Sequence, residues 1–158
     1  MQINTILVGL GNPFMCDDAV GIVVARRVHS QIKDNINLDL AEASVGGLDL
    51  IDILTGYDQA IIIDAVQTEN GKPGDFYILD LPDLGEGQTP AMSHHVGLLE
   101  GLELANRLGV KMPRDLRIYA IEVADPYTFV TSMTSSVEAA IPEVVETIVK
   151  DTCERAVN

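Results

Sequence analysis

The sequence predicts one α/β domain, built as a three-layer α-β-α sandwich around a mostly parallel, twisted sheet of about five strands with one antiparallel edge strand. Two runs, at residues 6–10 and 60–63, are almost entirely apolar, which is typical of parallel strands buried on both faces. Helix-like segments with apolar residues three or four positions apart alternate with the strand-like runs. A length of 158 residues suits one domain with a sizeable core, so we expect a single domain over residues 1–158.

The first half of the chain is expected to contain three strands separated by two helices. In order, we expect a strand at 6–10, a helix from 19 to about 32, a strand at 37–43, a short helix around 51–54 and a strand at 60–64. Val20, Val24 and Val28 form the apolar side of the first helix. Gly56 can end the second helix in a left-handed conformation. The strand at 60–64 ends on Asp64, a carboxylate after an apolar run.

The second half completes the alternation. In order, we expect a short edge strand at 76–79, a loop at 81–91, a helix that ends at Gly109, a strand at 116–123, a loop at 124–134 and a C-terminal helix. Ser93 can cap the helix before Gly109, whose predicted buried stripe is Leu98, Leu102, Ala105 and Leu108. Ser135 and Glu138 form a possible capping box for the last helix, but Pro142 conflicts with so early a start. That helix is therefore either kinked or begins near Ile141.

The charge and cysteine content exclude several classes of function. A formal net charge of −14 and a pI near 4.3 argue against binding to nucleic acid or to an anionic membrane surface, which need Lys and Arg. Cys16 and Cys153 form no CxxC pair, so no disulfide framework or structural zinc site is indicated. No signal-peptide pattern is present, and the apolar runs are far shorter than the roughly 20 residues that span a membrane. We expect a cytoplasmic protein.

Three side chains with metal-binding or acid–base chemistry stand near predicted junctions of strands and helices: Asp18, Asp64 and His94. Ligands bind open α/β sheets at the carboxyl ends of the strands, and two carboxylates with one imidazole suit a divalent transition metal. Each has a structural alternative. Asp17 or Asp18 can cap the following helix, Asp64 can bind loop amides, and either member of the His94-His95 pair can be a buried or an exposed side chain without a ligand role.

Other candidate residues have weaker patterns. Cys16 could be a nucleophile with a histidine as base, but no partner is suitably spaced and a small loop-filling residue is the simpler interpretation. Glu42 ends the second strand and is a candidate for support of the site or for loop capping. The run from Gly9 to Asn12 is not a dinucleotide fingerprint because Phe14 replaces the third glycine.

Four motifs taken together resemble the endopeptidases that mature nickel–iron hydrogenases. They are Gly9-Leu-Gly-Asn-Pro-Phe-Met-Cys-Asp-Asp-Ala-Val-Gly21, Ile63-Asp64-Ala65, Lys72-Pro-Gly74 and Ser93-His94-His95-Val96-Gly97-Leu98. The match runs in order from about residue 5 to residue 150 and includes the segment that begins at Val137. The resemblance implies a cytosolic protease that removes the C-terminal extension of a hydrogenase large-subunit precursor after nickel insertion.

The resemblance also implies a set of site residues. Its metal-binding positions correspond to Asp18, Asp64 and His94, and alignment on His-x-x-Gly-Leu selects His94 rather than His95. The nickel is expected to arrive with the substrate, and other divalent ions can occupy such a site in vitro. Whether the ion polarises the peptide bond or a carboxylate acts alone as the base stays open at this point. Glu42 replaces the family's usual Asp and is left outside the metal site.

Two other functions are compatible with parts of the sequence. Gly9-Leu-Gly-Asn-Pro13 also resembles the start of peptidyl-tRNA hydrolases, but the acidic charge and the missing His-Asn pair disfavour that class. A module that binds a nickel protein without cutting it is the non-enzymatic alternative. Cleavage of a precursor distinguishes the protease from both.

Overall fold

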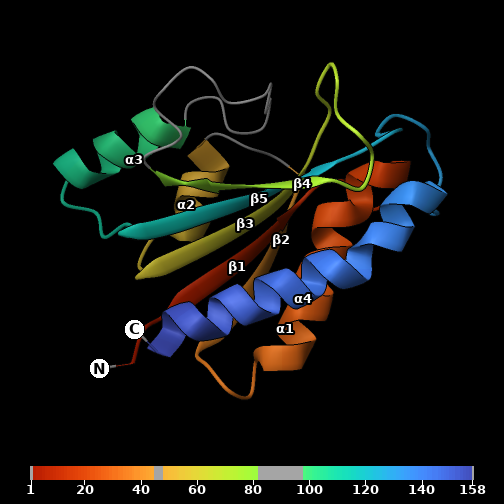
Figure 1. Cartoon of the computed structure of the whole chain (residues 1–158). Coiled ribbons are helices and arrows are strands. Elements are labelled where there is room, and N and C mark those ends of the chain that lie inside the picture. The colour runs from red at the N-terminus through yellow and green to blue at the C-terminus, as the bar shows by residue number, and fades with distance from the viewer. Residues whose placement is uncertain (1, 45–47, 82–97, 158) are drawn as a thin grey trace.

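The computed structural model describes residues 2–44, 48–81 and 98–157, which form a five-stranded sheet with helices on both faces (Figure 1). The strands are β1 (Thr5–Leu10), β2 (Leu38–Ala43), β3 (Gln59–Val66), β4 (Phe76–Asp80) and β5 (Asp115–Glu122). Their order is β2-β1-β3-β5-β4, with β4 antiparallel to β5 and every other neighbouring pair parallel. The predicted fold class, including the antiparallel edge strand, is confirmed.

Two α-helices cover each face of the sheet, the first and the last on one face and the middle two on the other. The helical elements are the 3-10 helix η1 (Cys16–Ala19), α1 (Val20–Ile32), α2 (Leu48–Leu54), α3 (Leu98–Arg107) and α4 (Ser135–Val157). Buried residues of α1 and α4 pack with Leu7, Ile61 and Tyr119 in one core. Buried residues of α2 and α3 pack with Val8 and Ile62 in the other. Alternate residues of β1 and β3 therefore enter opposite cores, which explains why these two strands have few polar positions.

The predicted elements agree with the structure except at their ends. β3 continues two residues beyond Asp64 to Val66, so Asp64 lies inside the strand rather than at its end. Gly56 adopts a φ of 91°, the left-handed conformation expected after α2. The predicted burial of Leu108 is wrong, because α3 ends at Arg107 and Leu108 is 71% exposed. Ser93 lies outside the described residues.

The C-terminal helix begins early despite its proline. α4 starts at Ser135, not near Ile141, and contains Pro142. The amide of Glu138 donates to the carbonyl of Thr134 at 3.0 Å, which places Thr134 at the cap position. Ser135 is therefore the first residue of the helix rather than its cap. Within the described residues, no helix is long and apolar enough to cross a membrane.

A charged network joins α4 to the β4–β5 edge of the sheet. Arg117 on β5 donates to both oxygens of Asp80 on β4, at 2.7 and 2.9 Å. The hydroxyl of Tyr119 donates to Asp151 on α4 at 2.8 Å. The hydrogen bond from Arg117 lowers the pKa of Asp80, while burial and the Asp151 carboxylate raise the pKa of Tyr119. These bonds fix the last helix across the strand that leads to the candidate site.

Candidate active site at the carboxyl edge of the sheet

The carboxyl ends of β1, β3 and β5 meet at one edge of the sheet. Figure 1 shows the loop after β3, the loop after β5 and the start of α1 gathered at this end. β3 is the central strand, with β1 and β5 on either side, so loops from three strands surround its end. This is the edge at which open α/β sheets bind ligands.

Gly21 brings the start of α1 against the backbone of β1 and β3. A Cβ atom added to Gly21 would lie 2.4 Å from the carbonyl oxygen of Leu10 and 2.5 Å from that of Ile63. Only a residue without a side chain allows this approach. It places η1, which carries Asp18, at the end of β1 and beside the part of β3 that carries Asp64.

Asp18 is held by the loop that leaves β1. Its Oδ2 accepts a hydrogen bond from the amide of Asn12 at 2.8 Å, and the side chain is only partly buried. Gly11 precedes that amide with a φ of 142°, and a Cβ there would lie 1.9 Å from the carbonyl oxygen of Asp18. The loop thus closes tightly on Asp18 while it leaves the carboxylate within reach of solvent.

Asp64 is a buried carboxylate, with 1% of its surface exposed. Its Oδ1 accepts a hydrogen bond at 2.8 Å from the amide of Ala65, the next residue of the same strand. Alternation along β3 puts Asp64 on the same face as Ile62, the face that α2 and α3 cover. Burial of a charged carboxylate is costly unless hydrogen bonds or a cation compensate for the lost water, so a site for a cation is one environment that suits this group.

His94 and His95 both lie outside the described residues. Within residues 2–44, 48–81 and 98–157, no three side chains of the His, Cys, Asp and Glu types gather closely enough to hold a metal ion. The chain enters α3 at Leu98, four residues after His94. The helix that follows His94 therefore packs on the face of the sheet toward which Asp64 points.

Asp17 has a role that the sequence did not predict. The sequence favours a cap on its own helix, but the fully buried carboxylate binds the segment between β5 and α4 instead. Its Oδ2 accepts from the amides of Ala124 and Asp125 at 3.0 and 2.9 Å, and its Oδ1 accepts from the amide of Thr134 at 2.8 Å. The Thr134 hydroxyl also donates to it, at 2.9 Å from Oδ1. Asp17 joins the loop after β5 to the loop after β1.

The environment of Cys16 disfavours a nucleophilic role. The residue is 5% exposed and adopts a φ of 48°. Burial, followed by the negative charge of Asp17, raises the pKa of its thiol. A reactive cysteine needs the opposite shift, because the thiolate is the nucleophile. The alternative interpretation, a small residue that fills the loop, fits these observations.

Two glutamates at strand ends have structural partners. Glu42 accepts from Nε and Nη2 of Arg26 on α1, at 2.9 and 2.5 Å. Glu122 at the end of β5 is 1% exposed and is a functional candidate that the sequence reasoning missed. It accepts from the amide of Thr68 at 2.9 Å and from the hydroxyl of Tyr77 at 3.1 Å. Glu122 thereby fixes the loop between β3 and β4, and a carboxylate at the end of an apolar strand was the available signal.

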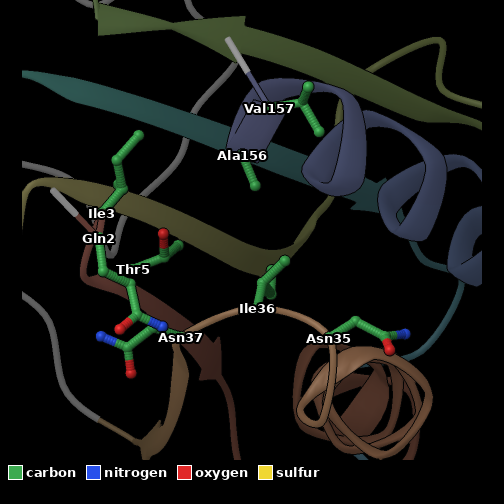
Figure 2. Close-up of a pocket in the computed structure, with 8 residues that line it drawn as sticks. All are labelled: Gln2, Ile3, Thr5, Asn35, Ile36, Asn37, Ala156 and Val157. Atoms are coloured by element: carbon green, nitrogen blue, oxygen red, sulfur yellow. The ribbon is translucent and has the colours of Figure 1, made fainter.

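A hollow of about 350 Å³ lies at the opposite, amino edge of the sheet (Figure 2). Its lining residues are Gln2, Ile3, Thr5, Asn35, Ile36, Asn37, Ala156 and Val157. None of them has a carboxylate, imidazole or thiol, the groups from which acid–base and metal sites are usually built. This hollow therefore offers no acid–base or metal site.

Comparison with known proteins shows that this chain is similar to hydrogenase maturation proteases. A family model described as hydrogenase maturation protease matches residues 22–151. The structure of the hydrogenase maturating endopeptidase HybD from E. coli superposes with a TM-score of 0.74 at 22% identity, over 97% of this chain and 94% of that chain. The nickel–iron hydrogenase maturation protease HybD from Thermococcus kodakarensis gives 0.68 at 20% identity, over 94% and 98%. The hydrogenase 2 maturation peptidase from a Thaumarchaeota archaeon gives 0.62 at 23% identity, over 94% and 97%. No curated protein sequence matches the chain.

Proposed function

This chain belongs to the hydrogenase maturation protease family, and from that membership we propose that it removes the C-terminal extension of a nickel–iron hydrogenase large-subunit precursor after nickel insertion. The family assignment makes the chain an endopeptidase. The match of the family model to residues 22–151 is the single observation that carries the proposal. A cytoplasmic location is part of the same proposal.

Asp18, Asp64 and His94 are the proposed site residues. In support, Asp18 and Asp64 supply carboxylates near the ends of adjacent strands, and the close packing at Gly21 brings their segments together. His94 precedes the helix on the face to which Asp64 points. Two carboxylate oxygens and one imidazole nitrogen form a mixed donor set that suits Ni²⁺ and leaves coordination positions for the substrate's own ligands.

The nickel is proposed to be cargo of the precursor rather than a resident cofactor. Contact of the three side chains with this ion would hold the extension's peptide bond across the carboxyl edge of the sheet. Cleavage then depends on metal insertion, since a precursor without nickel lacks the group that these side chains recognise. The ion supplies Lewis-acid chemistry when bound, and the carboxylates can hold or accept the proton of the attacking water.

Cleavage of nickel-loaded and nickel-free precursor tests this function. We expect the wild type to cut only the loaded form, and Asp18→Asn, Asp64→Asn and His94→Ala to lose at least about a hundredfold in rate, the usual contribution of an acid–base group. Asp34→Asn on the surface and His95→Ala are matched controls that should keep activity. Full activity in the three site variants would refute the assignment, and binding of precursor without any cleavage by the wild type would favour a non-catalytic module.

A further inference from the structure

We propose that Phe14, Tyr127, Phe129 and Val130 form an apolar binding surface for the precursor segment beside the scissile bond. We call these four residues the aromatic patch. They lie on the loops after β1 and β5, which flank the end of the central strand β3. The inference rests on the proposed function, because it identifies how the same site would hold its polypeptide substrate.

The aromatic patch contains the three exposed aromatic side chains of the described residues. The sequence has only three Phe and four Tyr. Phe14, Tyr127 and Phe129 are 54%, 74% and 80% exposed, and Val130 beside them is 38% exposed. The remaining Phe and the other three Tyr are buried or half-buried. A cluster of exposed aromatic side chains at one edge is typical of an interaction surface.

The patch is also fixed in shape. The rings of Phe14 and Phe129 stack with centroids 6.2 Å apart and an angle of 25° between their planes. The amide of Cys16 donates to the carbonyl of Val130 at 2.9 Å, which joins the two loops directly. The hydroxyl of Tyr127 donates to Oε1 of Gln67, on the loop after β3, at 3.2 Å. A surface ordered before binding loses little conformational entropy when a partner arrives.

A turn around Asp125 orders the second loop. Its Oδ1 accepts from the amides of Tyr127 and Thr128 at 2.9 and 3.0 Å, and its Oδ2 accepts from the Thr128 hydroxyl. These bonds lower the pKa of Asp125, so its carboxylate stays charged at neutral pH. Asp17 holds the same loop through the Asp125 amide. Both aromatic loops are therefore attached to the segment that carries Asp18.

Continuity with Asp18 indicates the substrate as the occupant. Oδ1 of Asn12 accepts from the amide of Phe14 at 2.9 Å, while the amide of Asn12 donates to Asp18. One short loop thus carries the exposed ring of Phe14 and, through the amide of Asn12, also binds the candidate carboxylate. The acidic net charge of −14 disfavours nucleic acid and anionic membranes at this edge. An extended peptide that crosses the site would place apolar side chains on the aromatic patch.

Steady-state cleavage of nickel-loaded precursor by a Phe14→Ser/Phe129→Ser variant tests the inference. We expect KM to rise by at least about tenfold with kcat nearly unchanged, because buried aromatic anchors supply much of an interface's affinity. Phe129→Ser alone, at the more exposed position, should give a smaller increase in KM with little risk to folding. Leu108→Ser is the matched control, since it removes an exposed apolar side chain at the far end of α3.

Direct binding of the precursor to each variant, measured in parallel, separates this inference from the proposed function. Loss of binding in the patch variants alone supports the aromatic patch, whether or not the wild type cleaves. An unchanged KM and unchanged binding in the double variant, with normal wild-type cleavage, overturn the patch and leave the protease assignment intact. A wild-type dimer that the double variant loses, with unchanged precursor binding, would instead make a second copy of this chain the occupant.

Discussion

Replacement of Asp17 by Asn should reduce stability far more than a surface substitution of the same kind. The fully buried carboxylate accepts bonds from three backbone amides and one hydroxyl that lie 107 to 117 residues away in sequence. Asparagine keeps the size of the side chain but has one acceptor oxygen and an NH₂ group that faces the remaining donors. At least one buried amide therefore loses its acceptor.

The expected magnitude follows from these contacts. A hydrogen bond to a charged group contributes about 1.5–3 kcal/mol, and a buried donor without an acceptor costs about 1–3 kcal/mol. We therefore expect Asp17→Asn to lower the free energy of unfolding by about 2–4 kcal/mol. Asp34→Asn, on the surface after α1, should change it by no more than about 0.5 kcal/mol.

Urea denaturation followed by circular dichroism measures the difference. With an m-value of about 2 kcal/mol per molar urea, the midpoint of Asp17→Asn should fall by about 1–2 M. Asp17→Asn should also displace the loops that carry the aromatic patch. We therefore expect KM for the precursor to rise together with the loss of stability. A midpoint within about 0.3 M of wild type would refute the view that Asp17 holds the two loops together.

The remaining predictions concern backbone packing and acid stability. Gly21→Ala should lower the free energy of unfolding by about 3 kcal/mol or more, because its Cβ would meet two backbone carbonyl oxygens. Gly101→Ala should lower it less, because the added Cβ would meet only side-chain atoms of Ile51. Equal urea midpoints for the two variants would contradict this prediction. Asp80 has a pKa lowered below 3.8 by Arg117, so its contribution is present above that pH and lost as the pH falls through the folded pKa. The stability difference between wild type and Asp80→Asn should therefore shrink below about pH 4 in acid denaturation, and a constant difference would be inconsistent with the ion pair.

The order and type of the elements were predictable because they depend on local patterns. Apolar runs at β1 and β3 and the spacing of Val20, Val24 and Val28 in α1 indicated strands buried on both faces and helices that cover them. The ends were less predictable. Leu108 continues the apolar spacing of α3, but the helix ends at Arg107, Gly109 turns the chain with a φ of 76°, and Leu108 is exposed.

The sequence by itself determined the fold class, the family resemblance and the acidic charge, since each depends on composition or on short motifs. Only the tertiary structure decided what Asp17, Glu122 and the aromatic patch contact. Asp17 meets the Thr134 amide 117 residues away, and Glu122 meets Thr68 across 54 residues. No local sequence pattern predicts such contacts, because they form only when the folded sheet brings the carboxyl ends of its strands to one edge. The role of a polar residue there is set by the loops that the sheet gathers around it.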